Sequence, residues 1–128
     1  MYERCFFPDK VRLYLQKEID RLFASGQSLV AYPLRIVYLP FNGIPASGST
    51  ISILVSVPKK LMKHAVKRNR IKRLIRESFR LNYNATAELY AKNGKYLHIA
   101  YIYICKELKP FTEIEKAVLK SFEIFQHL

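Results

Sequence analysis

The 128-residue sequence has few acidic residues, few cysteines and no long apolar run, and each shortage argues against a class of protein. The two cysteines, Cys5 and Cys105, lack the spacing of metal ligands, which argues against a disulfide framework or a cysteine-based metal site. No apolar run approaches the roughly 20 residues that a membrane span requires, and residues 1–10 lack the features of a secretory signal. We therefore expect one globular domain over residues 1–128, in the cytoplasm and without a membrane partner.

The acidic and histidine residues also form no pattern that is typical of a protein active site. A protein nuclease needs a cage of carboxylates around a metal ion, or a positioned general base and acid. The ten Asp and Glu are scattered, and Glu113 and Glu115 point in different directions on an expected helix. His64, His98 and His127 share no motif. We therefore predict no catalytic residue and no metal ligand in this chain.

Positive charge is abundant and concentrated in one segment. The 22 Lys and Arg give a formal net charge of +12. Ten of them lie between Lys59 and Arg80, where Glu77 is the only acid, so this window carries +9 of the total and leaves +3 for the rest. Charge gathered in a short segment indicates a surface for a specific polyanion, and nucleic acid is the first candidate.

The same window predicts a helix with two different faces. One face is an apolar stripe at helical spacing, formed by Ile71, Leu74, Ile75, Ser78 and Phe79. The opposite face carries Arg68, Lys72, Arg73, Arg76 and Arg80. Cations four residues apart repel one another, so this face gains nothing by itself and its use must be external. From Lys67 to Arg80 there are five Arg and two Lys. This preference for Arg is consistent with phosphate binding, because a guanidinium group can donate two N–H hydrogen bonds to the oxygens of one phosphate.

The apolar patterns along the rest of the chain predict an α+β sandwich, with helices packed on a small sheet. The expected elements are a helix over 11–26 with Leu13 in its stripe and Gly26 at its end, a strand over 32–39, a loop over 41–50, a strand over 51–57, the basic helix over about 64–82 with a short continuation to Gly94, a strand over 95–106, and a last helix that begins at a Thr112 cap. The tyrosines of the last strand, Tyr96, Tyr101 and Tyr103, fit either a buried core or a platform for stacking bases.

The segment "SVPKKLMKHAVKRNRIKRLIRESFR" resembles the bacterial ribonuclease P protein, the small basic subunit of the ribonucleoprotein that removes the 5′ leader from precursor tRNA. The matching residues are Ser56, Val57, Lys59, Lys60, Ala65, Val66, Arg68, Asn69, Arg70, Lys72, Arg73, Arg76 and Glu77. Phe23 and Gly26 match the first helix of the family more loosely. Three features differ from the family pattern: Pro58 replaces a serine, the link over 61–64 is one residue longer, and Ile19 stands where an aromatic residue is common.

The resemblance implies a single-domain αβββαβα fold in which a left-handed crossover between parallel strands carries the basic helix. It also implies two RNA surfaces. The surface for the catalytic RNA would comprise Lys59, Lys60, Lys67, Arg68, Asn69, Arg70, Lys72, Arg73, Arg76 and Arg80. A cleft for the single-stranded leader, between the first helix and the sheet, would comprise Phe23, Tyr38, Ser56 and Ile19.

The partners implied by the resemblance are the catalytic RNA of ribonuclease P and precursor tRNA, without a small-molecule cofactor. Mg²⁺ bound mainly by the RNA would supply the hydrolytic chemistry, and the protein alone would be inactive. Two alternatives stay open at this point. A ribosomal or other structural-RNA-binding protein would also carry a basic helix, although often with charged tails that this sequence lacks. A helix-turn-helix DNA-binding protein would need a helix closely before the basic one, where this sequence predicts a strand.

Overall fold

The computed structural model describes residues 16–45 and 49–128 and shows a mixed α+β fold. Leu13 and Cys5 lie outside the described residues. In chain order the elements are α1 (Gln16–Ser25), β1 (Gln27–Ala31), β2 (Leu34–Asn42), β3 (Ile51–Ser56), α2 (Ala65–Asn82), α3 (Asn84–Lys92), β4 (Lys95–Tyr103) and α4 (Phe111–Phe125). This order confirms the predicted helix–strand succession, with β1 as the third strand before the basic helix. No helix of the described part is long and apolar enough to cross a membrane.

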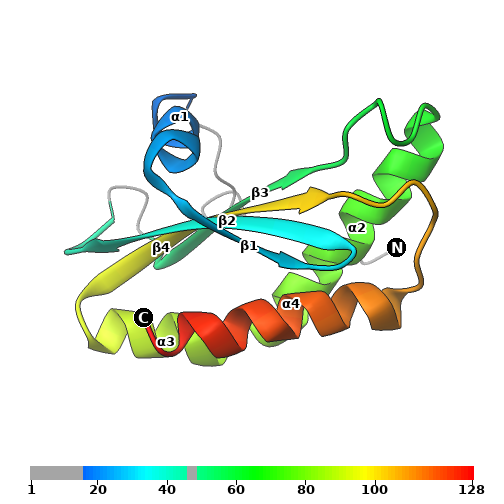
Figure 1. The fold of residues 1–128 in the computed structure, drawn as a ribbon. Coiled ribbons are helices and arrows are strands. Elements are labelled where there is room, and N and C mark those ends of the chain that lie inside the picture. The colour runs from blue at the N-terminus through cyan, green and yellow to red at the C-terminus, as the bar shows by residue number, and fades with distance from the viewer. Residues whose placement is uncertain (1–15, 46–48) are drawn as a thin grey trace.

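The four strands form one mixed sheet in the order β1-β2-β4-β3. β1 pairs with β2 and β2 with β4 in antiparallel fashion, whereas β3 and β4 are parallel. Helices α2 and α3 make the connection from β3 to β4, and Figure 1 shows that they return below the sheet in a left-handed sense. This crossover is an exception to the right-handed rule for parallel strands and confirms the predicted topology.

The helices cover the two faces of the sheet unequally. α2 and α4 pack together beneath one face, and α1 lies on the other (Figure 1). The larger core lies on the α2 and α4 side, where Phe79, Tyr101 and Phe125 are all fully buried. The predicted stripe of α2 faces this core, with Ile71, Ile75, Ser78 and Phe79 buried.

Strand alternation decides which residues of β4 belong to which face. Tyr101 and Tyr103 point into the larger core, and the Tyr101 hydroxyl lies 3.0 Å from Ser121 Oγ on α4. Ala100 belongs to the smaller cluster under α1, with Ile102 packed against it. Of the two alternatives for these tyrosines, Tyr101 and Tyr103 therefore take the core role.

Several boundaries differ from the sequence-based prediction. β4 ends at Tyr103 rather than at residue 106, and two further differences are instructive. β2 continues through Pro40 to Asn42, whereas the strand was expected to end before the proline. The pairing between β1 and β2 ends at Gln27 and Tyr38, so at Pro40 strand β2 is bordered only by β4. Proline lacks a backbone N–H, and this is tolerated where a strand has no second neighbour to accept a hydrogen bond. The prediction that Thr112 caps the last helix is wrong, because α4 begins at Phe111 with Pro110 at its N-cap.

Gly26 ends α1 as predicted, and it does so through close packing. Its N–H donates to the Leu22 carbonyl oxygen at 2.8 Å. A Cβ atom at this position would lie 2.4 Å from that oxygen and 3.0 Å from the Tyr38 carbonyl oxygen. Any larger residue would therefore push α1 away from β2.

Candidate nucleic-acid interface

α2 carries the densest positive surface of the described chain. Because its apolar stripe is buried against the sheet and α4, the remaining positions of the helix face outward. Lys67, Asn69, Arg70 and Arg73 are exposed, and Arg68, Lys72, Arg76 and Arg80 are half-buried. Strand β3, rather than a helix, precedes α2, so the arrangement is not a helix-turn-helix.

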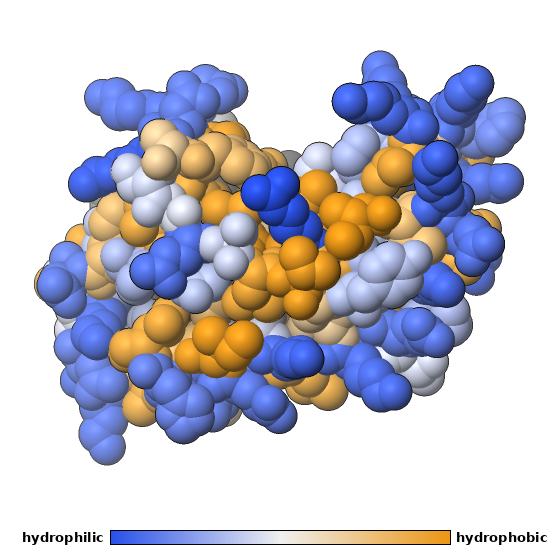
Figure 2. Space-filling view, in the orientation of Figure 1, coloured by the Kyte–Doolittle hydropathy of each residue, from blue (hydrophilic) through white to orange (hydrophobic). Residues whose placement is uncertain are grey.

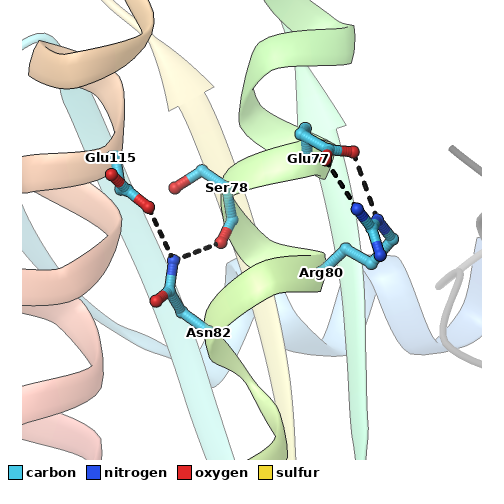
Figure 3. A network of polar contacts seen from close by, with 5 residues as sticks. All are labelled: Glu77, Ser78, Arg80, Asn82 and Glu115. Atoms are coloured by element: carbon cyan, nitrogen blue, oxygen red, sulfur yellow. Dashed lines mark hydrogen bonds and ion pairs between the residues drawn. The ribbon is translucent and has the colours of Figure 1, made fainter.

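Two of the predicted RNA-binding arginines make internal contacts. Arg80 is paired with Glu77, with 2.6 Å between Nη2 and Oε2, as Figure 3 shows. Arg68 Nη1 donates to the carbonyl oxygens of Met62 and Lys63 at 3.0 and 2.7 Å. Arg68 therefore fixes the link that precedes α2, and Arg80 is partly neutralised.

The C-terminal end of α2 is connected to α4 by a side-chain hydrogen bond. Asn82 Nδ2 donates to the Ser78 carbonyl oxygen at 2.8 Å and to Glu115 Oε2 at 3.1 Å. Figure 3 shows this contact on the side of α2 that faces α4, and the Glu77–Arg80 pair on the other side of α2. The basic helix is thus held at both ends before any ligand binds.

Four cations of α2 make neither an ion pair nor a side-chain hydrogen bond within residues 16–45 and 49–128: Lys67, Arg70, Lys72 and Arg73. We call these four residues the open cation face. Lys59 and Lys60 are exposed in the turn after β3 and extend the positive surface toward the sheet. Arginine and lysine in this density can hold several phosphate groups at once.

A second candidate surface lies on the α1 face of the sheet. Leu22 is fully buried there against Val37 and Ala100, and Ile19 packs beside them. Phe23, one residue farther along α1, is 47% exposed. Figure 2 shows hydrophilic surface over α1 and over the N-terminal end of α2, and a mixture of apolar and hydrophilic surface between them, below the dip in the outline.

Ser56 and Tyr38 fall on opposite faces of the sheet. Ser56 is half-buried and alternates with the core residue Val55, so it lies on the α1 face. Tyr38 is 7% exposed, and its ring meets that of Phe125 edge to face at 5.2 Å between centroids. Its hydroxyl donates to Gln27 Oε1 at 3.1 Å.

The prediction that Tyr38 shares a groove with Phe23 is therefore wrong. The physical reason is the two-residue period of a strand, because a shift of one position reverses the face of every side chain. Val37 and Leu39 take the positions of β2 that face α1. Ile19, Phe23 and Ser56 remain on the side where the cleft was expected.

Sequence reasoning missed an aromatic and charged cluster that anchors α1 to the sheet. The rings of Phe41 and Tyr96 stack with centroids 4.8 Å apart, and the Arg21 guanidinium lies 5.0 Å from the Phe41 centroid. His98 Nε2 lies 3.7 Å from Glu18 Oε1 of α1. Burial lowers the pKa of His98, against a smaller opposing effect of Glu18. Phe41 and Tyr96 are directly opposite each other on β2 and β4. This aromatic pair cannot be recognised from the sequence when residue 41 is expected to begin a loop.

No group of three His, Cys, Asp or Glu side chains that could hold a metal ion occurs in the part of the chain that the structure describes. The donor set that Mg²⁺ prefers, several oxygen ligands around one point, is thus not found among these residues. What the arrangement offers is charge and shape for binding a polyanion.

Comparisons with known proteins agree on one family. The family model described as Ribonuclease P matches residues 7–125. The ribonuclease P protein component of Porphyromonas gingivalis (strain ATCC 33277) is 44% identical over 110 residues, which cover 86% of this chain and 79% of that protein. The protein of the same name from Chlorobium phaeobacteroides is 35% identical over 101 residues, covering 70% and 67% of the two chains.

Solved structures show the same fold. The RNase P protein of Staphylococcus aureus superposes with a TM-score of 0.67 at 22% identity, covering 89% of this chain and 94% of that chain. The RNase P protein from Thermotoga maritima gives a TM-score of 0.65 at 23% identity and covers 91% and 96%.

Proposed function

The chain belongs to the ribonuclease P protein family, and from this premise we propose that it binds the catalytic RNA of ribonuclease P and the 5′ leader of precursor tRNA. In this role it assists the endonucleolytic removal of the leader that produces the mature 5′ end. Family membership favours this role over that of a ribosomal or other structural-RNA-binding protein, the alternative that the sequence left open.

The observation that carries the proposal is the open cation face. Four cations without an acidic partner in the described chain repel one another on a helix that is held rigidly by its buried stripe. A phosphate backbone relieves this repulsion and releases its own counterions on binding. Asn69 lies among these cations and is exposed, so it is placed to donate to the same RNA.

The groove on the α1 face is the proposed site of the leader. Phe23 offers a half-exposed ring and Ser56 a hydroxyl, while Ile19 supports α1 from below. A single strand is held by stacking of its bases on such apolar faces and by cations along its backbone. Tyr38 takes no part in this proposal.

The hydrolytic chemistry is proposed to come from the RNA partner. Mg²⁺ held mainly by that RNA would supply the activated water, and the protein would screen phosphate repulsion and hold the substrate. No step is assigned to a side chain of this protein.

Two measurements test the proposal. The isolated protein, treated with nuclease to remove RNA, should cleave no precursor tRNA in Mg²⁺, and added catalytic RNA should restore cleavage at the 5′ end. Arg73→Ala should weaken binding of the catalytic RNA. It should also reduce the magnitude of the slope of log K against log salt concentration by about 0.7–0.9, the contribution of one phosphate contact. Cleavage by the RNA-free protein, or an unchanged slope, would contradict the proposal.

A further inference from the structure

A hollow of about 510 Å³ lies where the link before α2 meets the loop between β4 and α4. Two segments that are distant in sequence line it: residues 60–67, which run from the link into the first turn of α2, and residues 106–108. Its charged lining residues are Lys60, Lys63, Lys67, Lys106 and Glu107. We call this site the lysine hollow.

The lysine hollow has a strong excess of positive charge. Four lysines face one acid, a net charge of +3 with His64 neutral. The carboxylate of Glu107 already lies 3.8 Å from Lys109 Nζ. None of the four lysines pairs with an acid in the described part of the chain. The hollow therefore collects charge that no group in that part of the chain balances.

The walls of the hollow are fixed by contacts within the protein. Met62 is 5% exposed and anchors the link in the core. The N–H groups of Leu61 and Met62 donate to the Pro58 carbonyl oxygen at 3.1 and 3.3 Å, and Arg68 holds the link from the side of α2. The longer link and Pro58, two of the three departures from the family pattern, thus form a fixed turn that presents Lys63 to the hollow.

From this geometry we propose that the lysine hollow binds phosphate groups of a bend in the catalytic RNA, so that Lys106 on the β4–α4 loop extends the RNA surface beyond α2. Lysine is a compact point charge with rotatable donors, which suits phosphate groups approached from several directions. Lys67 belongs both to the hollow and to the open cation face, so one strand can pass from one to the other. The inference rests on the proposed function and adds a contact that the basic helix alone does not provide.

The test measures affinity of the full chain for the catalytic RNA over a range of salt concentrations. Lys106→Ala and Lys63→Ala should each flatten the plot of log K against log salt by about 0.7–0.9, so that the affinity ratio of wild type to variant falls about threefold between 50 and 200 mM salt. Lys120→Ala is the matched control, because Lys120 is exposed on α4 outside the hollow. It should leave the slope nearly unchanged.

A gain of affinity provides a test that misfolding cannot imitate. Glu107→Gln removes the only acid of the hollow and keeps the backbone carbonyl that accepts from the Tyr103 hydroxyl. The variant should bind the catalytic RNA more tightly than wild type, with the largest gain at low salt, because the repulsion that it removes is screened at high salt.

The outcomes separate this inference from the proposed function. The lysine hollow would be overturned if Lys106→Ala and Lys63→Ala had the same slope of log K against log salt as Lys120→Ala. The proposed function would still stand if the slope for Arg73→Ala were reduced in the same experiment. Unchanged slopes in all variants, including Arg73→Ala, would reject the proposed function as well. Pyrophosphate is the probe for a small polyphosphate ligand: saturable binding to the isolated protein without any slope change in Lys106→Ala would assign the hollow to that ligand and overturn the RNA assignment.

Discussion

One face of the sheet is closed by α2 and α4 over a large cluster of buried aromatic and aliphatic side chains, whereas α1 covers the other face over a small cluster around Leu22, Val37 and Ala100. Both faces are built from the same strands, and only the alternation of side chains separates them. The first face excludes water almost completely. The second keeps a half-exposed aromatic residue, Phe23, at its margin.

Polar residues follow the same division. Arg35, Ser52 and Ser56 alternate with core residues and so share the α1 face, where Arg35 remains exposed. Polar groups on the closed face would carry the cost of burial unless each found a hydrogen bond, as the Tyr101 hydroxyl does with Ser121. This difference indicates that one face supplies stability and leaves the other available for a ligand, and substitutions on each face test this division.

The largest effect is expected from Phe79→Ala on the closed face. Phe79 is fully buried, stacks on Tyr83 and contacts the ring of Phe122. Removing such a side chain costs about 3–5 kcal/mol of the free energy of unfolding, because it leaves a cavity in a packed core. Urea denaturation of the RNA-free protein measures this loss. A loss below about 1 kcal/mol would mean that the closed face is not the main source of stability.

Phe23→Ala should affect substrate affinity more than stability, the opposite of Phe79→Ala. Because this ring is 47% exposed, we expect the free energy of unfolding to fall by less than about 1 kcal/mol. Affinity of the holoenzyme for precursor tRNA should fall by about 1–3 kcal/mol, the worth of one stacked base, while affinity for mature tRNA, which has no leader, stays nearly constant.

Tyr38→Phe is the control for Phe23→Ala. It removes one hydroxyl on the closed face, so it should lower stability by about 0.5–1.5 kcal/mol through the lost hydrogen bond to Gln27 and leave both tRNA affinities unchanged. Equal losses for precursor and mature tRNA in Phe23→Ala would remove Phe23 from the leader groove. A loss confined to precursor tRNA in Tyr38→Phe would contradict the assignment of the two faces.

The smallest effect concerns pH and the anchor of α1. Burial lowers the pKa of His98 below its ordinary 6.5, so His98 is neutral in the folded protein at pH 7. As pH falls through 6.5, the unfolded chain takes up a proton that the folded protein resists, and stability is lost down to the folded pKa. Urea midpoints at pH 7.5 and 5.5 should therefore differ more in wild type than in His98→Gln. An identical pH dependence would show that His98 is not held neutral on this face.

The basic helix could be predicted from the sequence because two independent patterns define it. The apolar stripe sets its period and its buried side, and the cations mark the outer side, so its expected span of about 64–82 agrees with Ala65–Asn82. β4 was predicted for a similar reason, since its aromatic and branched residues are dense enough to mark a central strand.

The candidate groove could be predicted only in part. Ile19 and Ser56 lie on the α1 face, where the cleft was expected, but only Arg35 distinguishes the two faces within residues 34–39, because both faces otherwise carry apolar residues. The register that decides between Val37 and Tyr38 comes from the hairpin with β1 and from the pairing with β4. Long-range pairing of this kind is not encoded in any short segment, which is why Tyr38 was assigned to the wrong face.

The position of β4 between β2 and β3 also sets the order in which the molecule can assemble during synthesis. β2, β3 and α2 are synthesised before residues 95–103, and β3 pairs only with β4 in the described sheet. Until then the β1–β2 hairpin is the only part of that sheet able to form, and the apolar stripe of α2 has no complete surface to cover. β4 is therefore the strand that completes the sheet, and the basic helix α2 can pack only after β4 has been made. A nascent chain that stalls before Lys95 leaves the apolar stripe of α2 without the surface that buries it.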